Sequence, residues 1–180
     1  MVNVTDTKTI KWWAVRVAYN GSLKVKHELD RLKIENFLPM AQKIVMRGER
    51  KVKVLVPAIN NLIFSRCSFE RLASYHDTTE CPVRYMIDRA TNAPISVPDQ
   101  QMNSFIAVAG QPDQQIIYLE PDVNGWQKGD IVRITGGVFA GAEGHFLRLK
   151  GDRRVVVSIN GVAAVATAFI HPSLVEKING

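Results

Sequence analysis

The chain is poor in features that mark secreted, metal-binding or membrane proteins. It has two cysteines in 180 residues, Cys67 and Cys81, without a CxxC pair or a Cys/His ligand spacing. We expect both to be reduced and partly buried rather than bound to zinc. No apolar run approaches the roughly 20 residues of a membrane-spanning helix, and the polar segment 1–11 lacks an apolar signal core. We therefore expect a cytoplasmic protein that needs no metal or other cofactor.

Motifs of common enzymes are also missing. The histidines, His27, His76, His145 and His171, lie far apart without an HExxH pattern, and there is no GxSxG. Gly136-Gly137 is not followed by the Lys-Ser/Thr pair that a phosphate-binding loop requires. We expect no enzymatic activity, although a catalytic site built from distant residues would leave no motif.

Positive charge is concentrated in the N-terminal third. Residues 1–54 hold 12 Lys+Arg against 5 Asp+Glu, a balance of +7, whereas residues 55–180 hold 11 against 12, a balance of −1. Attraction to nucleic-acid phosphates should therefore come from the first third of the chain.

The C-terminal region has the pattern of a small β-barrel. A strand at 130–134 leads into a glycine-rich turn anchored by Phe139, and strands follow at 145–149, 154–159 and 162–170. Asn160-Gly161 predicts a type I′ hairpin, in which both central residues have positive φ. Short strands with turns every eight to ten residues predict an SH3-like barrel over 126–180.

Before it, residues 10–110 predict an α+β domain with an antiparallel sheet and flanking helices. Strands are expected at 10–17, 37–45, 51–56, 61–65 and 83–88. Helices are expected after the N-caps Ser22 and Ser68 and between Pro98 and Gly110. Residues 1–9 read as a flexible tail, and 111–125 as a linker or arm.

The C-terminal pattern resembles the KOW motif, found in the NusG family of transcription elongation factors and in some ribosomal proteins. The matching residues are Gly129, Asp130, Val132, Arg133, Gly136, Gly137, Phe139, Gly141 and Gly144. Val138 departs from the family, which often has proline there. In relatives this barrel recruits a ribosomal protein or a termination factor.

The N-terminal half resembles the NGN domain that precedes KOW in NusG proteins. The matching points are Lys11 to Val15, the basic hairpin before Glu49-Arg50-Lys51, Pro57 at a strand start, and Ala93 to Ser96. Ala58 in place of glycine, Asn60-Asn61 in place of aliphatic residues and a short linker indicate a specialised paralogue. Residues 56–64 look like the UpxY group, associated with capsular polysaccharide operons.

The resemblance implies a factor that binds the clamp helices of RNA polymerase and suppresses pausing and termination. Its polymerase-binding residues would be Val56, Pro57, Ile59, Phe64 and Tyr85, with Trp13 less certain. All could instead be core residues, which is the favoured interpretation for Trp13 and Phe64. Non-template DNA or nascent RNA would meet Lys24, Lys26, His27, Arg31, Arg47, Arg50 and Lys51, unless these are ordinary surface charges. The hairpin cations, which include Lys53, could equally protect an exposed edge from pairing.

Three alternatives remain from sequence. A KOW-type RNA-binding or ribosome-associated protein would place its main contact on the barrel, which the charge balance disfavours. The chain could be the general elongation factor itself. It could also be a paralogue whose barrel changes fold, which the β signals from 155 to 170 oppose. Arg153-Arg154 is explained as a solvated surface pair.

Overall fold

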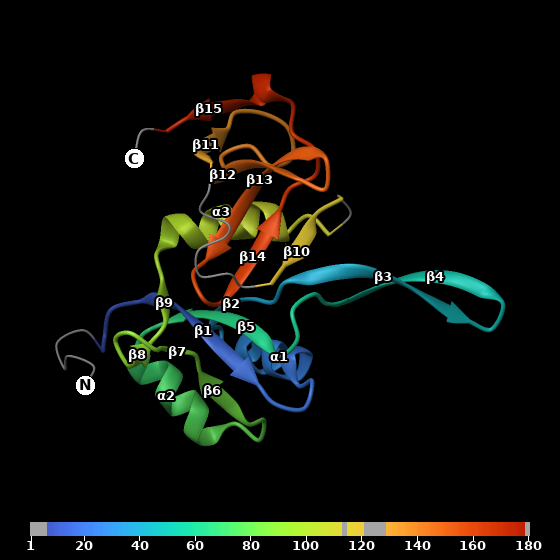
Figure 1. Ribbon diagram of the computed structural model, residues 1–180. Coiled ribbons are helices and arrows are strands. Elements are labelled where there is room, and N and C mark those ends of the chain that lie inside the picture. The colour runs from blue at the N-terminus through green and yellow to red at the C-terminus, as the bar shows by residue number, and fades with distance from the viewer. Residues whose placement is uncertain (1–6, 113–114, 121–128, 179–180) are drawn as a thin grey trace. The chain divides into compact units, whose positions relative to one another are not determined.

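The computed structural model describes residues 7–112, 115–120 and 129–178 (Figure 1). Contacts divide the chain into two units, and each is discontinuous in sequence. Unit 1 contains residues 1–39 and 59–99, and unit 2 contains residues 40–58 and 100–180. Residues 1–6 of the predicted tail, residues 113–114 and 121–125 of the predicted linker, and residues 126–128 at the start of the predicted barrel lie outside the described ranges.

Unit 1 is built around a central strand, β1 (Lys11–Val17), whose aromatic and β-branched residues are nearly all buried. Its sheet is antiparallel in the order β2-β5-β1-β6, and β9 also pairs with β1. The other strands of this unit are β2 (Glu35–Phe37), β5 (Leu62–Cys67), β6 (Val83–Tyr85), β7 (Ile87–Asp88), β8 (Ala93–Pro94) and β9 (Ser96–Val97). Strands β7 and β8 pair with each other. The prediction of an antiparallel sheet in this region is confirmed.

Two helices belong to unit 1. In α2 (Phe69–Thr78), the predicted N-cap Ser68 accepts a hydrogen bond from the backbone N–H of Arg71. In α1 (Ser22–Arg31), the predicted N-cap is wrong: Gly21 occupies that place without a side-chain cap, and Ser22 is the first helical residue and is buried. The small Ser22 side chain therefore packs against the fold instead of capping the helix.

The predicted strand 83–88 is interrupted at Met86. Its N–H donates to the carbonyl oxygen of Ala14 at 3.0 Å, and its own carbonyl accepts from Ile95 at 2.8 Å. Met86 thus connects β6, which pairs with β1, to the separate β7–β8 hairpin. The break lets the chain leave the main sheet and return as β9.

Unit 2 begins with a hairpin, β3 (Met40–Arg47) and β4 (Arg50–Pro57), which we call the arm. Among the described strands these two pair only with each other, from Met40 opposite Pro57 to Arg47 opposite Arg50 (Figure 1, cyan). Gly48 has positive φ at the first turn position, as a type II′ turn requires. The sequence predicted both strands and the basic turn.

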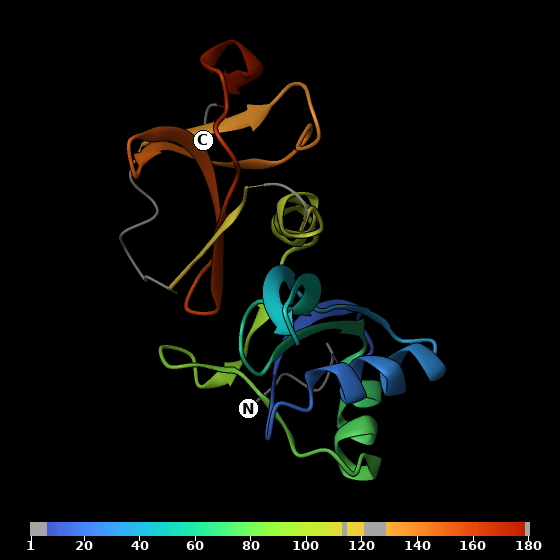
Figure 2. The same ribbon diagram turned by 90° about the vertical axis from the view of Figure 1, so that its right-hand side faces the viewer.

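A six-stranded antiparallel sheet forms the rest of unit 2, in the order β10-β14-β13-β12-β11-β15, and it is strongly curved (Figure 2). Its strands are β10 (Ile117–Leu119), β11 (Asp130–Ile134), β12 (Glu143–Leu149), β13 (Asp152–Ile159), β14 (Ala163–Ala166) and β15 (Val175–Lys177), preceded by the 3-10 turn η2 (Pro172–Leu174). The antiparallel strands are confirmed, whereas their assignment as a KOW barrel stays a prediction.

Helix α3 (Asp99–Ala109) packs on this sheet within unit 2. The hydroxyl of Ser104 accepts from the N–H of Glu143 at 3.1 Å, and the side-chain amide of Gln101 donates to the carbonyl of Ser158 at 2.7 Å. Of the four residues expected on one face of the helix, Met102, Phe105 and Ala109 are buried and Ile106 is half-buried. The bracketing of this helix by Pro98 and Gly110 was predicted correctly.

The type I′ turn predicted at Asn160-Gly161 is wrong. Only Gly161 has positive φ, and Ile159 pairs with Ala163, so the loop has three residues and buries its third, Val162. The two-residue loop with positive φ at both positions is Lys150-Gly151, between β12 and β13. Burial of Val162 therefore outweighs the local preference of Asn-Gly.

Candidate nucleic-acid interface

The tip of the arm places three predicted nucleic-acid contacts together. Arg47 pairs with Arg50 across the turn, and Lys51 lies opposite Met46. All three cations are exposed, and among the described residues none forms an ion pair with an acid. Arg47, Arg50 and Lys51 are therefore available to bind phosphate without first breaking a salt bridge.

The predicted basic face of α1 is largely neutralised. Lys24 forms an ion pair with Glu80 at 3.1 Å, and Lys26 pairs with Asp30 at 2.9 Å. Within the described residues His27 and Arg31 have no such partner, and both are exposed. The helix keeps much less free positive charge than the arm, because each paired lysine would have to give up an acidic neighbour.

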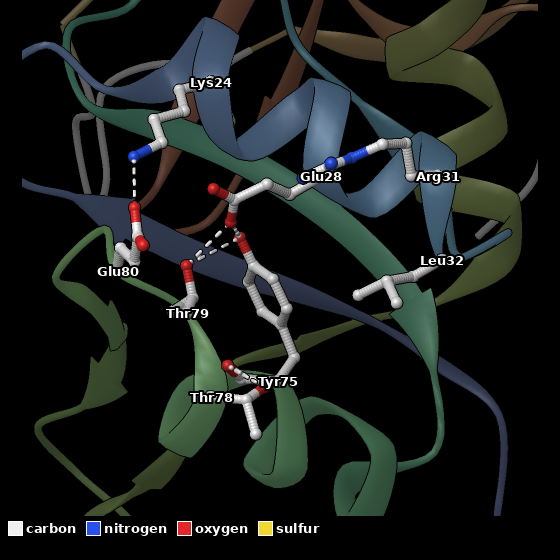
Figure 3. A pocket seen from close by; sticks show the side chains of 8 residues that line it. All are labelled: Lys24, Glu28, Arg31, Leu32, Tyr75, Thr78, Thr79 and Glu80. Carbon is white, nitrogen blue, oxygen red and sulfur yellow. Dashed lines mark hydrogen bonds and ion pairs between the residues drawn. The ribbon is translucent and has the colours of Figure 1, made fainter.

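Helix α1 also forms one wall of a cleft of about 520 Å³ (Figure 3). Its lining residues are Lys24, Glu28, Arg31, Leu32, Tyr75, Thr78, Thr79 and Glu80. The carboxylate of Glu28 accepts hydrogen bonds from the hydroxyls of Tyr75 and Thr79, each at 2.7 Å. Burial alone would raise the pKa of Glu28, but these two hydrogen bonds, with Lys24 and Arg31 nearby, lower that pKa overall. The polar groups satisfy one another, which fits a structural seam between α1 and α2.

Tyr85, one of the predicted polymerase-binding residues, lies in an aromatic cluster. Its ring centroid is 5.3 Å from that of Phe69 and 5.5 Å from that of His76, and Phe69 packs edge-on against Trp13. Tyr85 is half-buried, and burial raises the pKa of its phenol, with Asp77 adding to the effect. No described group hydrogen-bonds to its hydroxyl, so a rigid ring carries a polar edge that a partner can reach.

The other predicted docking residues differ in how deeply they are buried. Phe64 has no exposed surface and Trp13 is 6% exposed, so both belong to the core of unit 1, and Phe64 cannot touch a partner in this fold. Ile59 is half-buried and follows the base of the arm, where Val56 and Pro57 are also half-buried. The carbonyl of Asn60 accepts from Arg16, which fixes the segment next to Ile59 onto β1.

The glycine-rich segment 129–144 is architectural. Val132 and Phe139 are buried, and the turn closes where Gly141 donates to the carbonyl of Ile134 at 2.8 Å. A Cβ atom at Gly144 would collide with the carbonyl of Val156. Two charged residues of the predicted KOW set are exposed and form ion pairs: Asp130 with Lys177, and Arg133 with Glu143 and Glu176. The remaining members of the set, Gly129, Gly136 and Gly137, lie in turns or bends.

Two features of the site escaped sequence analysis. Ile44, Met46 and Leu55 on the arm are 61%, 59% and 54% exposed. Their alternation with cations was visible in the sequence, but a strand that pairs with only one neighbour could not be inferred from it. Arg154, predicted to be solvated, is instead buried, and its side chain donates to the carbonyls of Gln115 and Thr167.

Within the described ranges, no group of three or more His, Cys, Asp or Glu is placed to hold a metal ion. None of the helices in those ranges is long and apolar enough to span a membrane. Both cysteines are free and buried, where the sequence predicted partial burial.

The fold and the charges define a mixed α/β protein with an exposed basic arm. The family model described as "Transcription termination factor nusG" matches residues 10–106, which include the arm, Tyr85 and most of α3. The chain belongs to the NusG family of transcription factors. No curated protein sequence matches the chain significantly. A solved structure from Thermotoga maritima, titled "Domain interaction in Thermotoga maritima NusG", is similar at 18% identity and a TM-score of 0.45, covering 95% of this chain and 98% of that one.

Proposed function

We propose that this protein is an elongation or antitermination factor that binds RNA polymerase and suppresses pausing and termination. The observation that carries the proposal is the family match over 10–106, a range that contains both a half-buried aromatic surface and an arm of unpaired cations. No bond is made or broken in this role. The protein would act in the cytoplasm by holding polymerase and nucleic acid in one arrangement.

The polymerase contact is assigned to the segment 10–110, interpreted as an NGN domain. Tyr85 and Ile59 supply its anchors in unit 1, and Val56 and Pro57 at the base of the arm are the further candidates. Docking a helix in a groove requires apolar groups that are reachable yet held rigidly, and the packing of Tyr85 on Phe69 meets that need. The clamp helices of the polymerase are the proposed partner.

The nucleic-acid contact is assigned first to Arg47, Arg50 and Lys51, and second to Arg31 and His27 on α1. Phosphate contacts of this kind weaken with rising salt. Residues 126–180 are interpreted as a KOW domain that binds a ribosomal protein or a termination factor. The departures at Ala58 and Asn60-Asn61 favour a UpxY-type paralogue serving one polysaccharide operon.

The test is co-purification of RNA polymerase with the tagged full chain. We expect the wild type to retain polymerase and the double variant Tyr85→Ala/Ile59→Asp to lose it. The matched control is Tyr19→Ala/Ile10→Asp, because those side chains are 90% and 60% exposed in the same unit. Circular dichroism checks that both variants fold.

Equal recovery with both double variants would refute the assigned docking surface. Absence of polymerase from the wild-type preparation, with ribosomal proteins in its place, would favour an RNA-binding or ribosome-associated protein instead.

A further inference from the structure

The arm carries a dense group of exposed cations. Residues 40–57 contain five exposed cations against one acid, Glu49, a balance of +4 in a chain whose total is +6. The cations are Lys43, Arg47, Arg50, Lys51 and Lys53. None of them forms an ion pair in the described structure, whereas Arg66 and Arg133 each pair with two acids. A surface with this excess attracts a polyanion.

One face of the arm mixes these cations with exposed apolar side chains. The strand register places Met46 opposite Lys51 and Ile44 opposite Lys53, so both pairs share a face. Lys51 and Lys53 are two residues apart, about 6.8 Å along the strand. A basic row on β4 therefore runs beside an apolar row on β3, and Leu55 continues the apolar surface toward the base.

The composition of the arm favours a duplex over a single-stranded nucleic acid as its ligand. Residues 40–57 contain no Phe, Trp, Tyr or His. Proteins that hold single strands stack the bases on aromatic side chains, so the arm lacks the main device for that task. A duplex hides its base faces and presents phosphates and groove edges, which cations and small apolar groups can contact.

The dimensions of the major groove favour duplex DNA over duplex RNA as the ligand of the arm. The major groove of B-form DNA, about 12 Å wide, admits a two-stranded β-ribbon, whereas that of A-form RNA is too deep and narrow. Apolar side chains there meet the methyl group of thymine, and lysines reach the flanking phosphates. We propose that the arm binds duplex DNA in its major groove, with Lys51 and Lys53 on phosphates and Ile44 and Met46 toward the base edges. This inference rests on the proposed function and specifies its nucleic-acid partner.

The experiment compares the binding of the full chain to three ligands of one sequence: duplex DNA, single-stranded DNA and duplex RNA. Each strand has about 21 nucleotides, the length of two turns of B-form DNA. Fluorescence anisotropy across a salt series gives the Kd and the salt slope. We expect duplex DNA to bind most tightly. The triple variant Arg50→Gln/Lys51→Gln/Lys53→Gln removes both lysines assigned to phosphates and one arginine at the turn. It should weaken duplex binding roughly tenfold or more and reduce the salt slope by between about 2 and 3.

The matched control is Arg148→Gln/Lys150→Gln/Arg153→Gln, which removes the same charge from exposed positions at the β12–β13 turn. It should leave the slope within the error of the wild type. The variant Ile44→Ser/Met46→Ser should weaken duplex binding while keeping the wild-type slope, because it removes no charge.

Equal or tighter binding of single-stranded DNA or duplex RNA would overturn the inference, and so would an equal loss in both triple variants. Polymerase co-purification reports separately on the proposed function. If the wild type retains polymerase but shows no duplex preference, the inference fails alone. If duplex preference persists without polymerase binding, the proposed function fails alone.

Discussion

The guanidinium of Arg154 donates to the carbonyl oxygen of Thr167 at 2.6 Å, in a side chain that is only 8% exposed. The same nitrogen donates to the carbonyl of Gln115 at 3.0 Å, and the second terminal nitrogen pairs with Asp152 at 2.9 Å. Through these hydrogen bonds Arg154, which lies on β13, connects the segment before β10 with the segment that follows β14.

We expect Arg154→Met to destabilise the protein by about 2 to 4 kcal/mol, because it leaves two carbonyl groups without their donor. Urea unfolding followed by circular dichroism measures the change. Arg153→Met is the control: Arg153 is exposed over the ring of Phe146, and its replacement should cost less than about 1 kcal/mol. Equal losses in both variants would contradict the structural role of Arg154.

Gly144 is the glycine whose replacement should be most damaging. A Cβ atom there would strike the carbonyl of Val156 on the neighbouring strand, so Gly144→Ala should cost about 1 to 3 kcal/mol. Gly136→Ala is the matched change, since its nearest neighbour is the flexible end of Leu174 at 3.4 Å. Thermal unfolding should separate the two variants, and an unchanged Tm for Gly144→Ala would show that β12 and β13 are not so close.

The cap of α2 offers a third measurement. Ser68→Ala removes the acceptor for the N–H of Arg71 and should lower stability by about 1 kcal/mol, whereas Ser68→Asp should restore most of it. A loss of the same size in both variants would mean that packing, rather than the cap, depends on Ser68. Chemical unfolding of the full chain gives both values.

Glu28 should make stability depend on acid pH. Its pKa is lower in the folded chain than in the unfolded chain, so its contribution is complete above the unfolded pKa and is lost as the pH falls through the folded pKa. Glu28→Gln should therefore flatten the acid side of the stability curve. Unfolding free energies measured from neutral pH to below pH about 4 test this. A parallel curve for the variant would show that Glu28 does not titrate differently on folding.

Much of the fold could be predicted because its signals are local. The aromatic and β-branched run of β1, the cap at Ser68 and the Pro98–Gly110 bracket each depend on a few neighbouring residues. The failures depend on distant ones. Lys24 is neutralised by Glu80, and the buried Arg154 needs the carbonyls of Gln115 and Thr167.

In the candidate site, too, the features that depend on neighbouring residues could be predicted, and those that depend on distant residues could not. Runs of arginine and lysine at 47–53 identify the arm directly, because charge is visible in the sequence. Whether Phe64 is reachable depends on its burial in the fold: it has no exposed surface, and its strand β5 lies inside the sheet between β1 and β2. Pairing and burial, rather than residue type, decide which predicted contacts are available.

Discontinuity of the units sets an order of events during synthesis. Strand β1 pairs with β9 across almost the whole length of unit 1, as Trp12 opposite Val97 shows, whereas the arm closes at Gly48-Glu49. Short loops close at a lower entropic cost than long ones. The arm can therefore form while the ribosome is still adding α2, and the sheet of unit 1 can be completed only after Val97 has left the exit tunnel.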